Sequence, residues 1–566
     1  MLSLRFRGGL MSLARWLLAA VVCLLPASPC AAQEASRADE VDRLLEIVTS
    51  QQQQLDAQRQ ALDDIRAQLL QLQRAAEAST SSTPDSKRTD AAAPAAVQTP
   101  APQTTVPPGQ PPAPETGQRP LNPTQELAGE LPEGAPLQVG PAALRVGGYF
   151  GLMGIFRSTN SGGAPGTSFA SIPYADTAQG NVSEFRLSSQ ASRITIRADA
   201  DFPAGAENED IKNRRPRFKR LSGYFEMDFN GTTPGTVAVT SSSFGFRLRH
   251  AFGEAQYGDR FLLAVGQAFS LMTAPKDQLS IWPGDVELST AVDTNYLAGM
   301  IWDRAPQVRF TWRPSRRFNW AFSAENPEQQ IGNSLIGLPD CCAGDIESQY
   351  NTGSGELRVP NLMPDFVSRL AFSPVRAVHV DVGGVLRVFR LKVAPYADSF
   401  TEVGGGGSVN LQVHATAATK LLLQTAFGAG LGRYVGGLVP DVAFGSDGSI
   451  SPIPTRSWVA GIEQKLGPTY SLGGYYSGVV ADADYSVDAS GRFIGFGFPG
   501  SSKSNNRKID EITATFGWQV VSSAARGSVQ LGVQASWLSR TPLSGAADPS
   551  SADTFMVLSL LRYNLP

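Results

Sequence analysis

Arginine side chains recur at even spacing in several short stretches of this sequence. Arg193 and Arg197 belong to R-I-T-I-R, and Arg247 and Arg249 belong to R-L-R. Residues at even spacing share a face of an extended strand, so each pair would place like charges side by side. The guanidinium group presents a fixed fork of N–H donors that matches a carboxylate. The pattern therefore indicates a surface that attracts small anions.

Two further arginines extend this set, and acidic residues accompany it on the same predicted faces. The candidate solute-binding residues are Arg193, Arg197, Arg247, Arg249, Arg309 and Arg387. The accompanying acids include Asp199, Glu226, Asp228, Glu325, Asp381, Glu463 and Glu511. The alternative interpretation is that the arginines pair with these acids and brace a wall. The two closely spaced arginine pairs favour anion binding, because like charges on one face have no evident structural use.

The other motifs that could indicate a nucleotide-binding, metal-binding or catalytic site are weak. Gly495–Gly500 fits G-x-G-x-x-G without a strand–helix context, so a turn is the better interpretation. His250, His379 and His414 lie far apart and lack the spacing of metal ligands. The sequence contains no G-x-S-x-G motif, no H-E-x-x-H motif and no Cys–His pairing. We therefore expect no enzyme activity, no cofactor and no metal site.

Extended strands must position the arginines, and the clearest of them is Ser528–Leu538. It reads S-V-Q-L-G-V-Q-A-S-W-L, with one apolar and one polar face. Fifteen further stretches alternate similarly, and the full set is Leu144–Phe156, Phe185–Phe202, Leu221–Asn230, Phe246–Tyr257, Phe261–Gln267, Gln307–Arg313, Phe318–Glu325, Asp365–Phe372, Val378–Arg390, Ser408–Ala415, Leu421–Leu431, Ser457–Lys465, Ser471–Val480, Asp510–Trp518, Ser528–Leu538 and Thr554–Tyr563.

The strands predict an all-β fold, a transmembrane antiparallel β-barrel of about sixteen strands. Short turns such as Arg313–Arg317 alternate with long Gly/Ser/Asp-rich loops such as Asp482–Asn506. The same alternation would suit an inverted sandwich with its apolar faces inside. The strand number and an N-terminal signal sequence favour the membrane barrel. Its aromatic girdles are expected at strand ends, from residues that include Tyr149, Tyr224, Tyr257, Trp458, Tyr476, Trp537 and Tyr563.

A lumen of this size is narrowed by loops that fold inward. The segment Ala268–Ala305 is the expected constriction loop. Its charged residues are Lys276, Asp277, Asp285, Glu287 and Asp293, among others. Together with the arginines, this loop predicts a channel that passes anions better than cations.

Residues 1–32 predict a cleaved secretory signal, with Arg5, Arg7 and Arg15 before an apolar run. No later run of about eighteen apolar residues follows, so we expect no transmembrane helix. The formal net charge of −3 is too small to indicate a nucleic-acid partner. Cys341 and Cys342, the cysteines left after cleavage, are adjacent in a predicted loop. A vicinal disulfide and two free thiols are both open interpretations.

Two segments precede the barrel, which we expect to occupy residues 142–566. Residues 39–75 carry an a/d heptad from Val41 to Leu72, which indicates a self-associating coiled coil, a trimer by its core residues. A lone amphipathic helix is the alternative. Residues 76–141 are rich in Pro, Ala and Thr and predict a disordered, extended linker.

Several short motifs, in this order, resemble the DcaP-like trimeric outer-membrane porins. They are Val146–Gly151 in the opening strand, Gly266–Leu271 at the entry to the constriction loop, Pro306–Phe310, Ala324–Glu328, and the ending Leu561–Asn564. The resemblance covers nearly all of the mature chain. It implies a sixteen-stranded homotrimeric channel in the outer membrane, a periplasmic coiled coil, and passage of small anions such as dicarboxylates. The terminal Leu565-Pro566 and the cysteine pair depart from the pattern.

Two other functions remain open at this point. A phosphate or general-anion porin would carry lysine ladders, whereas this sequence places arginines on its polar faces. A surface adhesin would accommodate a coiled coil, but it would have a long stalk before a very short barrel.

Overall fold

A computed structural model describes residues 137–162, 165–202, 218–232, 242–332, 335–351, 361–394, 399–543 and 550–566. The predicted signal sequence, the coiled coil and the linker up to residue 136 lie outside these residues. Within the described part of the chain, no helix is both long and apolar enough to cross a membrane.

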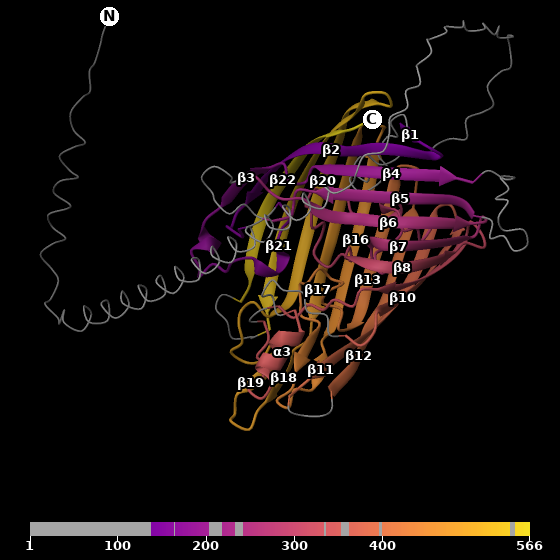
Figure 1. The fold of residues 1–566 in the computed structure, drawn as a ribbon. Helices are drawn as coiled ribbons and strands as arrows, with labels where there is room; N and C mark the ends of the chain where they lie inside the picture. Colours follow the sequence, from indigo (N-terminus) through magenta and orange to yellow (C-terminus); the bar gives the residue numbers. More distant parts are fainter. Residues whose placement is uncertain are drawn as a thin grey trace, which may run out of the picture. The chain divides into compact units, whose positions relative to one another are not determined.

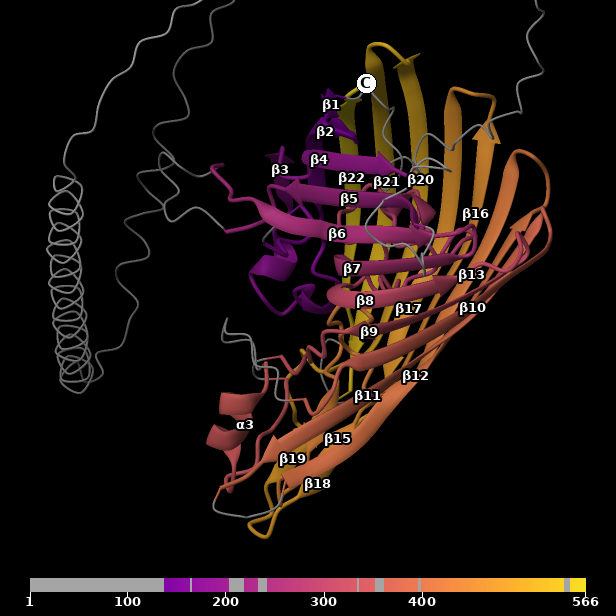
Figure 2. The same ribbon diagram turned by 45° about the vertical axis from the view of Figure 1, so that its right-hand side comes forward.

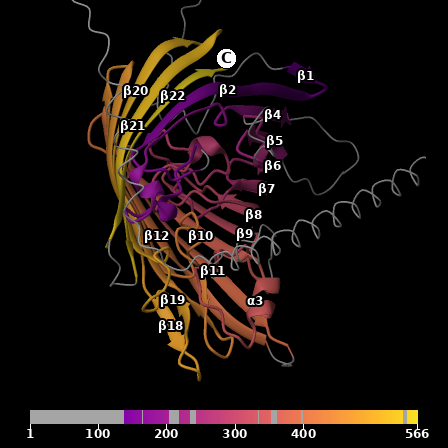
Figure 3. The ribbon, with the colours of Figure 1, turned by 90° about the vertical axis from the view of Figure 1, so that its left-hand side faces the viewer.

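The described chain forms a closed antiparallel barrel of sixteen wall strands (Figures 1 and 2). The barrel closes where β2 pairs with β22, with Tyr149 opposite Asn564 (Figure 3). The wall strands are β2 (Ala142–Arg157), β3 (Glu184–Ser188) together with β4 (Arg193–Asp201), β5 (Phe218–Asp228), β6 (Arg247–Tyr257), β7 (Phe261–Phe269), β8 (Arg304–Trp312), β9 (Phe318–Glu325), β10 (Asp365–Val375), β11 (Val378–Lys392), β12 (Ser399–His414), β13 (Thr419–Ala429), β16 (Pro454–Leu466), β17 (Tyr470–Ala481), β20 (Asn506–Ser523), β21 (Gly527–Pro542) and β22 (Ala552–Asn564).

Strands β3 and β4 are two halves of a single wall strand, because both pair with β2. The remaining elements are small and lie mostly in loops. They are β1 (Leu137–Val139), β14 (Val442–Phe444), β15 (Ile450–Pro452), β18 (Asp484–Val487), β19 (Phe493–Phe496), the helix α3 (Ala343–Gln349), and the 3-10 turns η2 (Phe169–Ser171), η3 (Gln179–Asn181) and η4 (Pro283–Asp285).

The all-β prediction and each of the sixteen predicted strands are confirmed, although some boundaries were wrong. Strand β12 begins at Ser399, nine positions before the predicted Ser408, and includes Gly404–Gly407, which the sequence suggested to be a loop. These glycines pair with β11 and β13. A Cβ atom at Gly406 would lie 2.3 Å from the carbonyl oxygen of Phe427 and 2.8 Å from Leu431, so the glycines allow close approach by neighbouring segments.

The end of the predicted linker was also wrong. Leu137–Val139 forms β1 and pairs with Ala142–Leu144 of β2. Gly140 has φ of +59°, in the left-handed region that suits the tight turn between these strands.

The two faces of the wall follow the predicted alternation. On β21, Trp537 is 44 % exposed on the outer face, whereas Gln534 is fully buried on the inner face. Tyr149 and Tyr224 were wrongly assigned to the outer aromatic girdles, because both point inward. The ring of Tyr149 contacts the guanidinium groups of Arg193 and Arg562, and the hydroxyl of Tyr224 donates to Glu226.

Long loops gather at one end of the barrel, the end that faces outward in outer-membrane barrels. We name them L1 (158–183), L3 (270–303), L4 (326–364), L6 (430–453) and L7 (482–505). Loops L1 and L7 are joined by an ion pair between Asp176 and Lys503, 2.6 Å long. The hydrogen bond from Lys503 holds the pKa of Asp176 below its usual range.

Candidate solute-binding site

Loop L3 folds into the barrel and is held on more than one side of the lumen. The backbone N–H of Leu271 donates to Glu325 on β9, at 2.8 Å. On the opposite wall, the N–H of Ala298 donates to Glu511 on β20, also at 2.8 Å. The side chain of Lys420 on β13 lies 2.5 Å from Glu287 of the loop. The loop is therefore fixed across the interior, as expected for a constriction.

The charged residues expected near the constriction divide into two groups. Lys276 and Asp277 remain accessible to solvent, close to the short turns. Asp285, Glu287 and Asp293 instead serve to hold the loop. Asp285 accepts backbone hydrogen bonds inside L3, Glu287 pairs with Lys420, and Asp293 accepts the backbone N–H of a residue in L1.

The predicted arginine pairs meet on neighbouring strands of one wall. Strand β5 places Asp228 directly between Arg193 of β4 and Arg247 of β6. Arg247 binds Asp228 through two nitrogens, at 2.6 and 3.0 Å. Arg249 lies 2.5 Å from Glu226 and 3.0 Å from Asp228. Arg193 is 3.5 Å from Glu226. The arginines cluster, as the anion-binding interpretation predicts, and they also pair with acids, as the bracing interpretation predicts.

A fourth guanidinium group, that of Arg304, gives this cluster an excess of positive charge. Arg304 begins β8 and interacts electrostatically with Arg247 and Arg249. Among the described residues, no carboxylate oxygen lies within salt-bridge distance of it, and its buried Nη1 has no hydrogen-bond partner. Its guanidinium lies over the rings of Phe269 and Trp302, 5.6 and 5.4 Å from their centres. Arg304 was not among the predicted residues, because the strand predicted there begins at Gln307, whereas β8 begins at Arg304.

We call Arg193, Arg247, Arg249 and Arg304 with Glu226 and Asp228 the arginine cluster. Four guanidinium groups there face two carboxylates. The side chain of Arg247 is 34 % exposed and that of Arg193 is 13 % exposed, so water reaches the cluster. Such a site can accept one or two small carboxylates by charge-assisted hydrogen bonds.

Further along β4, Arg197 faces an aromatic residue of the constriction loop. Its guanidinium lies 4.4 Å from the ring centre of Trp282, and the indole N–H of Trp282 donates to Glu254 at 2.8 Å. Arg197 also pairs with Asp199 at 2.7 Å and is 31 % exposed. No sequence pattern predicted the contact of Trp282 with Arg197, because this contact depends on how deeply L3 enters the lumen.

The last two predicted arginines occupy different environments. Arg309 is buried and donates to the backbone oxygens of Phe269 and Ser280, which hold L3 against β8. Arg387 is fully buried between Asp365, at 3.0 Å, and Asp441 of L6, at 2.6 Å. These placements favour bracing over contact with a solute. Solute binding by any of the six arginines remains a prediction.

The described residues contain no group of three or more His, Cys, Asp or Glu that could hold a metal ion. One histidine does have notable neighbours. The Oγ of Ser373 lies 2.9 Å from Nδ1 of His379, and Nε2 of His379 lies 3.3 Å from Asp381. Ser373 belongs to β10 and the other two residues to β11, so the hairpin of these strands brings the set together. Asp381 is also bound by Arg369 and by Asn410.

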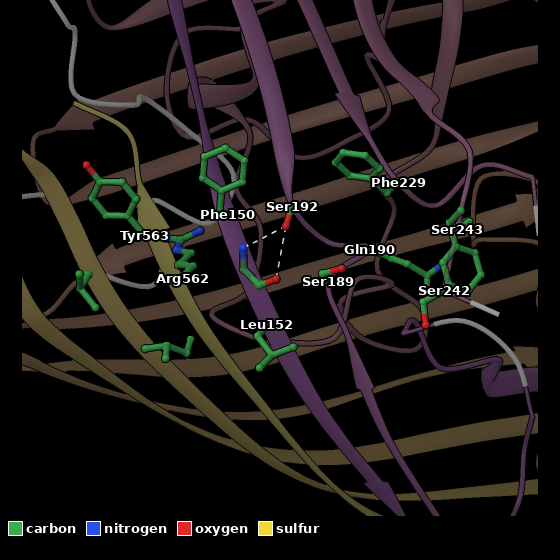
Figure 4. A pocket seen from close by; sticks show the side chains of 14 residues that line it. Phe150, Leu152, Ser189, Gln190, Ser192, Phe229, Ser242, Ser243, Arg562 and Tyr563 are labelled. Atoms are coloured by element: carbon green, nitrogen blue, oxygen red, sulfur yellow. Dashed lines mark hydrogen bonds between the residues drawn. The ribbon is translucent and has the colours of Figure 1, made fainter. Parts of the chain in front are cut away.

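A hollow of about 700 Å³ lies on the outer face of the wall, where β3 and β4 are interrupted (Figure 4). Its apolar rim includes Phe150 and Leu152, which are 57 % and 48 % exposed. Polar residues of the interruption, Ser189 and Gln190, also line it. The hydroxyl of Ser192 bonds to the backbone of Gly151 and so bridges the gap in the ladder. This hollow faces away from the lumen.

No family model matches the chain, and no curated protein matches it. Solved structures do resemble it. The outer-membrane channel DcaP of Acinetobacter baumannii superposes with a TM-score of 0.55 at 15 % identity, covering 76 % of this chain and all of that chain. An anion-selective porin from Comamonas acidovorans follows with a TM-score of 0.42 at 12 % identity, covering 75 % of this chain and all of that one. The resemblance to DcaP-like porins is therefore confirmed as a similarity of fold.

Proposed function

We propose that this chain forms an outer-membrane channel for passive diffusion of small hydrophilic solutes and favours small anions such as dicarboxylates. The arginine cluster is the observation that carries this proposal. Four guanidinium groups against two carboxylates leave a positive field beside a water-accessible wall, and an inward-folded loop faces it. Lumen-facing charge of this kind sets the selectivity of a channel. The fold, which resembles a channel protein, supports the same conclusion.

Reversal potentials of single channels in a KCl gradient test the anion preference. We expect the reversal potential to have the sign of a channel that is more permeable to chloride than to potassium. A preference for potassium would refute anion selectivity, even if the channel conducts.

A porin for phosphate or for anions in general is the alternative within the transport class. Lysine ladders would favour it, but Lys420, which faces the lumen, is committed to Glu287 and Glu463. Competition between succinate and phosphate for channel block separates the two alternatives. A surface adhesin, by contrast, should give no solute-selective swelling of liposomes.

The set Ser373, His379 and Asp381 favours a second candidate, a serine hydrolase. We give it less weight, because Arg369 and Asn410 already bind Asp381 and account for its presence. Labelling of Ser373 by a fluorophosphonate, lost in His379→Gln, would support catalysis. Failure to label leaves the channel as the function.

We further infer a homotrimer that assembles through the barrel and through the coiled coil of residues 39–75, which would lie in the periplasm. The hollow beside β3 supports a contact through the wall, since polar groups and strand interruptions at membrane depth need cover from protein. Deletion of Val41–Leu72 should lower the thermal stability of the oligomer. Unchanged stability would make this segment a spacer.

A further inference from the structure

The adjacent cysteines form a disulfide whose two sulfurs have different surroundings. Cys341 and Cys342 are bonded to each other just before α3. Cys341 is exposed to solvent, whereas Cys342 is 3 % exposed. The disulfide therefore has one cysteine at the protein surface and the other in the interior.

The buried sulfur of Cys342 belongs to an apolar cluster that joins L4, L6 and β11. The cluster is composed of Ile331, Ile336, Cys342, Ile346, Tyr350, Phe389, Leu391, Val393, Val442, Phe444 and Ile450. The turn between β14 and β15 sits directly on this sulfur, because a Cβ atom at Gly448 would lie 3.0 Å from it. Cys342 thus helps to seat the L6 hairpin.

The same cluster supports the brace around Arg387. The ring of Phe389 lies 4.8 Å from the guanidinium carbon of Arg387, which in turn binds Asp441 of L6. Directly after α3, the hydroxyl of Tyr350 donates to the backbone oxygen of Arg390 at 3.0 Å. The disulfide is therefore in contact with the packing that fixes L4 and L6 at the long-loop end of the barrel.

We propose that this disulfide is a thiol-reactive site, opened at Cys341 by a small external thiol, and that opening it loosens L4 and L6. Thiol–disulfide exchange requires access to the sulfur that is attacked. Only the sulfur of Cys341 offers this access. The conductance part of the proposal rests on the proposed channel function, whereas the chemical part does not.

The exchange step is balanced without another oxidant or reductant. The thiolate of the small thiol attacks Sγ of Cys341, and a new S–S bond forms there. The Cys341–Cys342 bond breaks, its electron pair goes to Sγ of Cys342, and that sulfur takes a proton from water. The products are a mixed disulfide on Cys341 and a buried thiol on Cys342. The bond that held the two side chains together is lost.

Peptide mapping by mass spectrometry tests the chemical step on the chain from residue 33 onward, which lacks Cys23 and Cys30, in detergent and with reduced glutathione as the probe. We expect one glutathione per chain, located on Cys341, and no alkylation by iodoacetamide before glutathione is added. An adduct on Cys342, no adduct at all, or alkylation of the untreated protein would each overturn the proposal.

Single-cysteine variants test the difference in accessibility separately. In Cys342→Ser, the remaining Cys341 should react with iodoacetamide roughly tenfold faster than Cys342 does in Cys341→Ser, because access of the reagent controls the rate. Equal rates in folded protein would contradict the asymmetry. The wild-type mapping stands on its own if either variant fails to fold.

Planar-bilayer recording tests the coupling to L4 and L6. Glutathione should increase current fluctuations of the wild-type channel and leave a Cys341→Ser/Cys342→Ser variant unaffected. Unchanged current in protein that carries the adduct would overturn the coupling. A chain that forms no channel would refute the proposed function, while the mapping result would still decide whether the site is thiol-reactive.

Discussion

The walls around β4–β6 and around β10–β11 look alike in sequence but differ in the structure. Both place arginines on the inner face opposite Asp or Glu. On the first wall, Arg247 keeps a third of its side chain exposed while it binds Asp228. On the second wall, the side chain of Arg387 is fully buried and contacts Asp365, Asp441 and backbone oxygens. The difference comes from the loops, since L4 and L6 supply groups that bury Arg387, whereas Arg247 stays within reach of water although its neighbour Arg249 is only 3 % exposed.

This comparison shows that charge on a lumen-facing strand has two uses. In the proposed channel, an arginine that remains partly exposed would exchange a carboxylate of the wall for one from a solute. A buried arginine cannot do so without leaving charged groups uncompensated. Whether such an arginine is exposed or buried thus depends less on its position along the strand than on the loop that covers it.

The largest difference between the two walls should appear in stability. Arg387→Met leaves Asp365 and Asp441 buried without their shared cation, which should cost about 3–5 kcal/mol of unfolding free energy. Arg247→Met should cost less than about 1 kcal/mol, because Arg249 still binds Asp228 and the site is partly wet. Urea unfolding in detergent micelles measures both. Equal losses of unfolding free energy in the two variants would contradict the distinction between a buried bracing arginine and a partly exposed one that lines the pore.

A second effect concerns the loop anchor opposite the arginine cluster. Lys420→Met removes the buried cation that Glu287 and Glu463 share, a loss of about 3 kcal/mol for the anchor of L3. Single-channel recordings should show larger current fluctuations as the loop moves. Gln534→Leu serves as the milder control, because it removes only neutral hydrogen bonds: those that Gln534 accepts from the N–H groups of Val292 and Asp293, and the one that it donates to Ser536. A quieter channel in Lys420→Met than in the control would contradict a fixed loop.

The smallest effect is expected where the first wall meets L3. Trp282→Leu removes the ring beneath Arg197 and the donor to Glu254, so Arg197 should lose about 0.5–1 kcal/mol of cation–π attraction. Block by an aromatic carboxylate should weaken a few-fold, while block by succinate should change less. Identical changes for both solutes would assign Trp282 a purely structural role.

Much of the barrel could be predicted from the sequence, because a two-residue repeat specifies a face. The strands and the inward direction of Arg193 and Arg247 follow from that repeat. Burial could not be predicted in this way, since Arg247 and Arg387 have the same local pattern and differ only in what lies above them. Trp282 was missed for the same reason, because L3 brings it to Arg197. Arg304 was missed because the predicted strand began at Gln307, whereas β8 begins at Arg304. Gly404–Gly407 was wrongly predicted to be a loop, because a run of glycines is typical of loops. Its place in a strand depends on the close approach of neighbouring segments, which the sequence does not show.

The strand Ser528–Leu538 illustrates the limit. Its apolar face was predicted correctly to be the outer one, and its polar face carries no charged residue. In the structure, Gln534 accepts the backbone N–H groups of Val292 and Asp293 and thereby holds the constriction loop. A neutral strand can therefore position the loop that faces the charged strands.

The reversal potential in a KCl gradient, measured for the wild type and for Arg247→Gln, tests the central claim most directly. The wild-type channel should prefer chloride. Loss of one cation at contact distance removes about 1 kcal/mol of attraction, so the anion preference of Arg247→Gln should fall roughly fivefold. A wild-type channel that prefers potassium, or a variant with unchanged preference, would contradict the assignment of selectivity to the arginine cluster.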